Sequence, residues 1–260
     1  MKALENIIDF RACPLDDETF VRCCHRKLVS KGVATIPGFL TPTARKILIS
    51  EANARHPDAF HTTTPHNVYL TKPDPTLSRD HIYNHQVISS KACIATDQIP
   101  ANSALKLIYC SSEFRQFAAY VLGVEKLYEY ADSLSSINVH YAGEGKELGW
   151  HFDNSAFAIT LLLQAPEGGG TFEFVRDLRN SEQGNMNFAG VADVIEGRIK
   201  PTSLNLQPGT LMIFRGRNSM HRVTPTIGEK TRILVVFAYN QEYGISLSEP
   251  ARMTFFGRLS

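Results

Sequence analysis

The chain has 260 residues, of which 43% are hydrophobic and 10% aromatic, so it can bury a sizeable core as a globular protein. Its 27 Lys and Arg residues balance 26 Asp and Glu residues, and the net charge of +1 provides no field that would hold a polyanion or draw the chain to an anionic membrane. We therefore expect neither nucleic acid nor a membrane as a partner.

The N-terminal stretch MKALENIIDFRACPLDDE has no apolar core of the signal-peptide kind, because Glu5, Asn6 and Asp9 interrupt it. No apolar run elsewhere approaches the roughly 20 residues of a membrane span. The five cysteines are an odd number without a CxxC pair, which favours reduced thiols. We therefore expect a cytoplasmic protein.

Helices alternate with extended segments over the first 130 residues. Two aspartates precede an amphipathic run that ends at Lys31, before Gly32, and VATIPGF then predicts a strand. The segment TPTARKILISEANARH begins with an N-cap threonine and has Pro42 in its first turn, which indicates a helix. Residues 111–122 predict another helix. Residues 1–130 are expected to support the core and to contribute a substrate-binding segment.

From residue 135 the pattern changes to short apolar or alternating runs separated by turns. About eight strands at this spacing favour an antiparallel sandwich or barrel. The segment NMNFAGVADVIEGRIK predicts a helical insertion near residues 185–198. No repeat or clear linker divides the chain, so we predict one domain, 1–260, of the α+β class with a mainly β core at 131–260. The predicted strands are SSINVHY, GWHFD, FAITLLLQ, GGTFEFV, TSLNLQ, GTLMIFRG, MHRVTP and RILVVFAYN.

A His-x-Asp pair lies at one of these strands, in ELGWHFDNSAFAITLLLQ. His151 and Asp153 are two residues apart, so on a strand their side chains leave the same face, and Trp150 is expected to point away from them. His221 follows several strands later. Two imidazoles and one carboxylate, with the other coordination positions open, are the ligand set of a non-haem iron(II) oxygenase. We therefore predict a metal site on His151, Asp153 and His221.

Arg232 begins the last apolar strand, TRILVVFAYN, and is expected to direct its guanidinium into the barrel. There it can pair bidentately with the far carboxylate of a dicarboxylic acid, and Thr231 or a nearby hydroxyl can add a hydrogen bond. A lone His-x-Asp pair is more often a surface pair than a ligand pair. Its position ahead of the glycine-rich hairpin PEGGGTFEF, of His221 and of Arg232 favours a catalytic metal site.

These motifs, GWHFDNSAFAITLLLQAPEGGGTFEFV, LQPGTLMIFRGRNSMHRVTP and TRILVVFAYN, resemble the iron(II)/2-oxoglutarate-dependent dioxygenases. The resemblance is dense from about residue 127 to residue 257, and it is greatest to the branch of free-amino-acid hydroxylases and carrier-independent amino-acid halogenases. It implies a double-stranded β-helix, or jelly roll, of the cupin-like kind. It also implies the cofactors iron(II), 2-oxoglutarate and O2, and release of succinate and CO2 as an unactivated C–H bond is oxidised.

Carried over to this chain, the resemblance assigns iron to His151, Asp153 and His221 and the C5 carboxylate of 2-oxoglutarate to Arg232. Asn138, in the preceding strand, is a further candidate for holding the cosubstrate. We expect no catalytic residue beyond the metal site.

Three branches of the superfamily are disfavoured by single positions. Halogenases of the resembling branch have a small residue in place of the carboxylate ligand, so Asp153 favours a hydroxylase. Nucleic-acid demethylases carry a second arginine further along the last strand, where this chain has Ala238. Collagen-type prolyl hydroxylases usually anchor the cosubstrate with lysine rather than an arginine such as Arg232. Two alternatives stay open: desaturation or cyclisation of an amino-acid-derived metabolite in natural-product biosynthesis, and a non-catalytic cupin-like sensor.

The substrate is expected to be a small molecule, most simply a free amino acid. Its carboxylate needs a cation or several donors, for which the segment SRDHIYNHQVISSK offers His85 and Gln86. Asn154, next to the metal ligand, is a candidate polar contact. If Arg232 faces the interior, Leu234, Val236 and Ala238 share its face and favour an aliphatic side chain. Alternatively, this strand faces only the metal and the cosubstrate, and the N-terminal segment and the region around Phe255 and Phe256 build the side-chain pocket.

Overall fold

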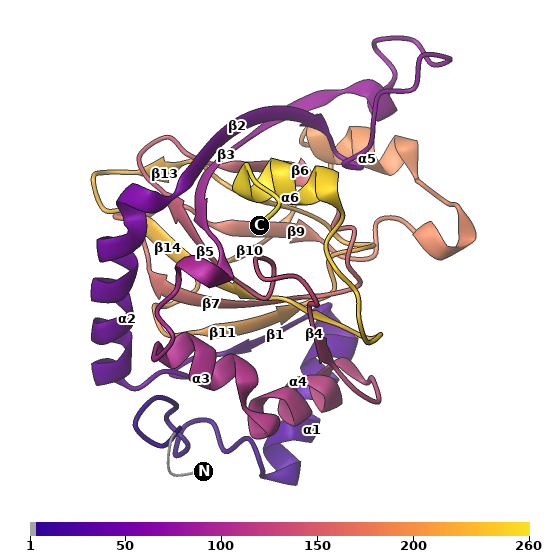
Figure 1. Cartoon of the computed structure of the whole chain (residues 1–260). Coiled ribbons are helices and arrows are strands. Elements are labelled where there is room, and N and C mark those ends of the chain that lie inside the picture. The colour runs from indigo at the N-terminus through magenta and orange to yellow at the C-terminus, as the bar shows by residue number, and fades with distance from the viewer. Residues whose placement is uncertain (1–3) are drawn as a thin grey trace.

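The computed structural model describes residues 4–260. Helices and strands alternate over the first half of the chain, and the middle of this half contains a long hairpin (Figure 1). The elements of this half are α1 (Glu18–Lys31), β1 (Val33–Ile36), α2 (Pro42–Arg55), β2 (Phe60–Asn67), β3 (Gln86–Ile94), α3 (Ala104–Cys110) and α4 (Ser112–Leu122).

Strands dominate the second half, and α5 interrupts them. The elements are β4 (Tyr128–Glu129), β5 (Ile137–Ala142), β6 (Leu148–His151), β7 (Ala158–Gln164), β8 (Gly168–Gly169), β9 (Phe172–Val175), α5 (Phe188–Ile195), β10 (Thr202–Leu204), β11 (Leu211–Phe214), β12 (Met220–Val223), β13 (Thr226–Ile227), β14 (Arg232–Phe237), β15 (Tyr239–Asn240) and α6 (Glu249–Phe256).

Capping side chains define the predicted helices. The Asp17 carboxylate accepts a hydrogen bond from the backbone at the start of α1, and the helix ends at Gly32, which has a φ of 74°. Thr41 caps α2 in the same way, and Ser111 caps α4. These predictions, and the helical insertion now seen as α5, are confirmed.

Several elements are absent from the sequence prediction, among them both strands of the long hairpin, β2 and β3. The segment FHTTTPHN forms β2 although its side chains are mostly exposed and polar, so it lacks the apolar alternation that would identify a strand. It pairs along its whole length with β3, and the hairpin arches over the barrel (Figure 1). The short helices α3 and α6 also escape the pattern. The hairpin and α6 both bear on the candidate site.

Eleven strands form one antiparallel sheet that supplies both walls of the jelly roll. Its order is β1, β11, β7, β14, β5, β3, β6, β12, β9, β10, with β2 on the outer side of β3. A separate pair, β8 with β13, forms a small hairpin-like sheet beside Arg232. The α+β class with a mainly β jelly-roll core is therefore confirmed.

Helices α1 to α4 lie against the strands at one side of the barrel (Figure 1). Ile233, Val235 and Phe237 of β14 belong to the large core shared with these helices. Because side chains alternate along a strand, Arg232, Leu234 and Val236 face the barrel interior. In β5, Asn138 lies opposite Val236 and His140 opposite Leu234. Arg232, Asn138 and His140 therefore lie on one interior wall of the barrel.

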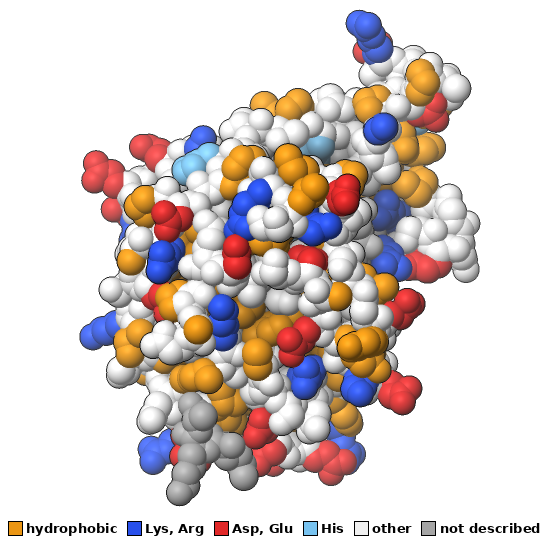
Figure 2. All heavy atoms as spheres, viewed as in Figure 1, with side chains coloured by type: hydrophobic (Ala, Val, Ile, Leu, Met, Phe, Trp, Pro, Cys, Tyr) orange, Lys and Arg blue, Asp and Glu red, His pale blue; other side chains and the backbone are white. Residues whose placement is uncertain are grey.

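The surface carries mixed charge. On the face shown in Figure 2, Lys and Arg side chains are interspersed with Asp and Glu, with no broad patch of one sign. This agrees with the net charge of +1. Within residues 4–260, no helix has both the length and the apolar character needed to cross a membrane.

Candidate metal centre

Strand pairing brings the two histidines together. β6 and β12 are antiparallel neighbours, and His151 lies directly opposite His221 in their register. Asp153 is not on the strand as predicted, because β6 ends at His151. Instead, the Asp153 backbone N–H donates to the Gly216 carbonyl at 3.1 Å. This hydrogen bond holds the segment after β6 so that the Asp153 carboxylate lies beside both imidazoles.

The three side chains form a compact donor set, the only metal-competent group of this kind found within residues 4–260. One ligand atom from each lies within 4.8 Å of the others. The Asp153 Oδ1 atom lies 3.7 Å from His151 Nε2 and 3.4 Å from His221 Nε2. Two donors at right angles on one ion with bonds of roughly 2.1 Å would be about 3 Å apart, so small shifts suffice for common ligation.

Hydrogen bonds select the tautomer that a metal requires. His151 Nδ1 lies 2.7 Å from the Gly149 carbonyl, and His221 Nδ1 lies 2.9 Å from the Ser219 carbonyl. Because a carbonyl only accepts, each Nδ1 carries a hydrogen, which leaves Nε2 as the ring nitrogen that can bind a metal. Burial, reinforced by His221, lowers the pKa of His151 to about 3, so this imidazole is neutral at pH 7.

Asp153 supplies the negative charge of the site. Burial alone would raise the pKa of its carboxyl, but the adjacent His221 and His151 lower it on balance. Gly216 makes room for this carboxylate, because a Cβ atom at position 216 would overlap it. Two imidazoles and one carboxylate fit iron(II), and the fit rests on the chemistry of these donors.

A second layer of contacts orients His151 and shields His221. Ser89 Oγ accepts from the Gly149 backbone N–H at 3.0 Å and lies 2.6 Å from His66 Nε2. The rings of Phe172 and Phe214 have centroids 5.7 Å and 4.9 Å from that of His221. Trp150 packs away from the metal ligands with its ring against the Arg222 guanidinium, as alternation predicted.

A pocket of about 250 Å³ opens beside Asp153. It brings together five of the predicted residues: Asn138, Asn154, Val236, Ala238 and Phe256. Phe255, from the region that the sequence offered as an alternative pocket wall, also lines it, whereas His140 was missed by the sequence prediction. His140 follows Asn138 at a spacing of two, so the alternation in INVHY contained the signal for it.

Arg232 lies in a neighbouring cavity of about 370 Å³, built partly by the glycine-rich hairpin. Gly170 allows this approach, because a Cβ atom there would lie 3.0 Å from Arg232 Cδ. Burial lowers the pKa of Arg232 to about 10, so the guanidinium is charged at pH 7. No carboxylate within residues 4–260 forms an ion pair with it. Phe172 lines the same cavity and faces His221, so the cavity extends toward the metal ligands.

Other predicted residues lie outside these two cavities. His85 and Gln86 are exposed where the hairpin begins its second strand. The Thr231 carbonyl accepts from Gln164 Nε2 at 2.8 Å, and its hydroxyl lines neither cavity. Leu234 is buried on the same strand as Arg232 but is not among the side chains that line the pocket.

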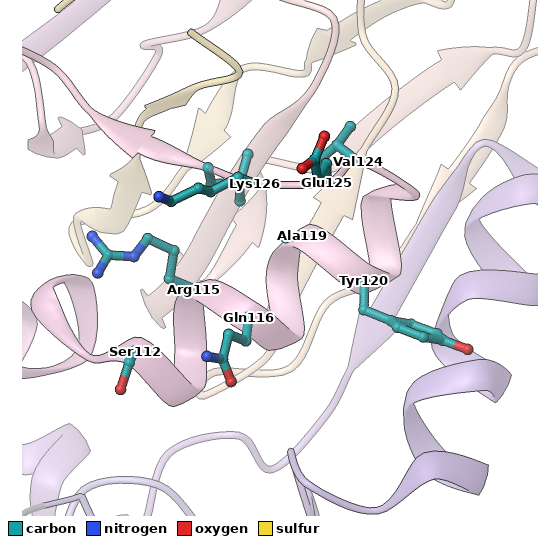
Figure 3. A pocket seen from close by; sticks show the side chains of 9 residues that line it. Ser112, Arg115, Gln116, Ala119, Tyr120, Val124, Glu125 and Lys126 are labelled. Atoms are coloured by element: carbon teal, nitrogen blue, oxygen red, sulfur yellow. The ribbon is translucent and has the colours of Figure 1, made fainter. Parts of the chain in front are cut away.

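A further hollow lies along α4, remote in sequence from the metal ligands (Figure 3). In it Arg115 already pairs with Glu129 at 3.1 Å, so its charge is balanced. Lys126 lies over the Tyr128 ring. The hollow carries no cluster of metal-ligating groups among its described residues.

Comparisons with known proteins agree with this geometry. The model of a family described as Halogenase D matches residues 15–250. A 2OG-Fe(II) oxygenase family oxidoreductase from Burkholderia pseudomallei is similar in structure, with a TM-score of 0.54, 12% identity, and coverage of 88% of this chain and 95% of that one. The alpha-ketoglutarate-dependent epimerase SnoN from nogalamycin biosynthesis is similar with a TM-score of 0.58 and 13% identity, and the match covers 86% of this chain and 84% of that one. A Pseudomonas putida prolyl-4-hydroxylase is similar with a TM-score of 0.52 and 14% identity, and the match covers 84% of this chain and 98% of that one. No curated protein matches the sequence.

Proposed function

The chain belongs to the Halogenase D family, and from this membership we propose that His151, Asp153 and His221 hold iron(II) while Arg232 holds 2-oxoglutarate. The fold is that of the 2OG-Fe(II) oxygenases. The predicted superfamily, the iron(II)/2-oxoglutarate-dependent dioxygenases, and the cofactors iron(II) and 2-oxoglutarate are confirmed. The hydroxylase type is part of the proposal. The observation that carries the residue assignments is the preoriented His-Asp-His set beside a buried arginine that has no ion-pair partner within residues 4–260.

Iron(II) with 2-oxoglutarate and O2 supplies the oxidising chemistry, and the chain supplies placement. The Gly149 and Ser219 carbonyls keep the two imidazoles in the ligating tautomer. The planar guanidinium of Arg232 can take both oxygens of the far carboxylate of the cosubstrate. The aromatic rings around His221 limit water at that side of the site.

Consumption of 2-oxoglutarate tests this function against the alternative of a non-catalytic sensor. Incubation with iron(II), ascorbate and O2 is expected to release succinate in proportion to the 2-oxoglutarate consumed. A protein that binds 2-oxoglutarate without releasing succinate in the presence of each candidate substrate would be a sensor.

Hydroxylation rather than halogenation follows from the space around Asp153. Its carboxylate fills the position between the two histidines and packs against Gly216. A halide would therefore compete with an ionised group whose pKa is already lowered. This supports hydroxylase chemistry even though the family carries the name of a halogenase.

Chloride is accordingly expected to leave the product unchanged. The wild-type enzyme should form the same oxidised product at the same rate in chloride-containing and chloride-free buffer of matched ionic strength, measured by mass spectrometry. Bromide serves as a second halide control. A chlorinated or brominated product from the unmodified enzyme would contradict the role given to Asp153.

We further propose that the substrate is a free amino acid with a small or medium aliphatic side chain. The pocket beside Asp153 includes Val236, Ala238 and Phe256, none of which offers a side-chain hydrogen bond. A charged side chain against this wall would lose hydration at a cost of several kcal/mol, whereas an aliphatic one gains about 0.8 kcal/mol per buried methylene. The polar side chains of Asn138 and Asn154 are available at the same pocket.

In a competition at equal concentration, valine, leucine or isoleucine is expected to be consumed ahead of lysine, arginine and aspartate. The mass of the product shows which reaction took place. A gain of one oxygen atom indicates hydroxylation, and a loss of two hydrogen atoms indicates desaturation or ring closure. Preferred turnover of lysine, arginine or aspartate would show that other residues line the side-chain pocket.

A further inference from the structure

A second, partly buried cation stands near the candidate metal centre. Lys91 lies on β3, two residues before Cys93, and Cys93 pairs with His140 of β5. His140 in turn pairs with Leu234 of β14, two residues after Arg232. Side chains two apart on a strand share a face. Lys91 therefore faces the same interior wall as Arg232.

The two cations lie at the same end of this wall, but Arg232 lines one cavity and Lys91 contacts a residue of the other. Strands β3 and β14 both pair with β5, one on each side of it. The Cα atoms of Lys91 and Arg232 are therefore separated by two strand spacings, or about 10 Å. Arg232 lines the cavity of the glycine-rich hairpin. The Lys91 Nζ atom instead lies 3.9 Å from the centroid of the Phe255 ring, and Phe255 lines the pocket beside Asp153.

No carboxylate within residues 4–260 lies close enough to Lys91 to form an ion pair, although Asp153 acts on it at longer range. Within residues 4–260 it forms no ion pair, and its close partner is the ring of Phe255. Burial lowers its pKa to about 8, offset in part by Cys93 and Asp153, so the amine is still mostly charged at pH 7. The pKa of Cys93 is raised to about 12 and that of His140 is well below its usual value, so both neighbours are neutral.

A buried cation without an anion costs stability unless a ligand supplies the missing charge. Arg232 has no charged neighbour that shifts its pKa, whereas Lys91 interacts electrostatically with Asp153. Lys91 does not itself line the pocket beside Asp153, but its ammonium lies directly behind Phe255, which does, so a shift of the Phe255 ring would bring the charge to that pocket. An ammonium is a suitable point partner for one carboxylate.

We propose that Lys91 binds the carboxylate of the substrate, while Arg232 binds that of 2-oxoglutarate. This inference rests on the function proposed above and extends it to a specificity-determining residue. It requires the substrate to carry a carboxylate at one end and to present an apolar part to Val236, Ala238 and Phe256. The cation is Lys91, the last residue of the segment SRDHIYNHQVISSK, rather than the exposed His85 or Gln86 of the same segment.

The test compares Lys91→Met with Lys91→Arg, and with Lys72→Met as a matched control at an exposed lysine. Each iron-loaded protein is titrated anaerobically, in the presence of 2-oxoglutarate, with the best of the six amino acids of the competition and with its amide, in which a neutral group replaces the carboxylate. Calorimetry gives the affinities. Steady-state kinetics give separate Michaelis constants for amino acid and 2-oxoglutarate.

Lys91→Met is expected to weaken amino-acid binding about 30-fold or more, the effect of losing roughly 2 kcal/mol or more from a buried charge pair. Amide binding and the Michaelis constant for 2-oxoglutarate should change little. Lys91→Arg should recover part of the affinity, and Lys72→Met should match wild type.

Two results would overturn the assignment of Lys91. A rise in the Michaelis constant for 2-oxoglutarate alone would assign Lys91 to the cosubstrate, and an equal loss for amino acid and amide would assign it a packing role on Phe255. Both results leave the proposed function standing. Failure of the wild-type enzyme to release succinate from 2-oxoglutarate would instead contradict the proposed function itself.

Discussion

Replacing His151 or His221 by alanine is expected to abolish iron-dependent release of succinate from 2-oxoglutarate. Each histidine contributes one of three donors, and each is held in its ligating tautomer by a backbone carbonyl. Loss of a residue that merely supports a metal ligand typically costs about 10–100-fold in metal affinity or activity, so loss of the ligand itself should cost more.

Iron content gives a readout independent of turnover. After equilibration with iron(II) and removal of excess metal, both variants should retain far less iron than wild type. His61→Ala, at an exposed histidine of β2, is the matched control and should retain wild-type iron and activity. Chelator-treated wild-type enzyme should be inactive and recover when iron(II) is restored. Full turnover by either ligand variant would remove that histidine from the metal centre.

Replacing Arg232 by alanine is expected to raise the Michaelis constant for 2-oxoglutarate far more than that for the amino-acid substrate. A charge-assisted pair in a dry cavity is worth on the order of 2–5 kcal/mol, which corresponds to roughly 30-fold to several thousand-fold in affinity. Arg232→Lys should be intermediate, because the ammonium keeps the charge but loses the planar fork. Arg26→Ala, on the exposed side of α1, is the matched control.

Stability separates this role from a structural one. In the ligand-free protein the Arg232 guanidinium is buried without an ion-pair partner within residues 4–260. Removing an unpaired buried charge relieves a desolvation cost, so the melting temperature of ligand-free Arg232→Ala should not fall. Protection by 2-oxoglutarate against thermal unfolding should disappear in the variant. An unchanged requirement for 2-oxoglutarate would exclude Arg232 as its anchor.

The local signals in the sequence were sufficient for most elements of the core. Apolar runs between turns correspond to the strands from β5 to β14, and the caps at Asp17 and Thr41 correspond to helix starts. These features depend on neighbours in sequence, through side-chain alternation and backbone capping. Where a strand is polar and exposed, as β2 is, its pairing with β3 stabilises it and leaves no local signature.

The candidate metal ligands and Arg232 could be predicted because residue type, order and strand alternation agree there, and the histidines do face each other across β6 and β12. The position of Asp153 beyond the strand, held by the Gly216 carbonyl, was decided by a contact between distant segments. The same is true of Lys91. The segment that ends at Lys91 was a candidate for binding the substrate carboxylate, but only the pairing of β3 with β5 and the packing of α6 place Lys91 against Phe255 of the pocket. Strand order depends on non-local hydrogen bonding, which no short stretch of sequence encodes.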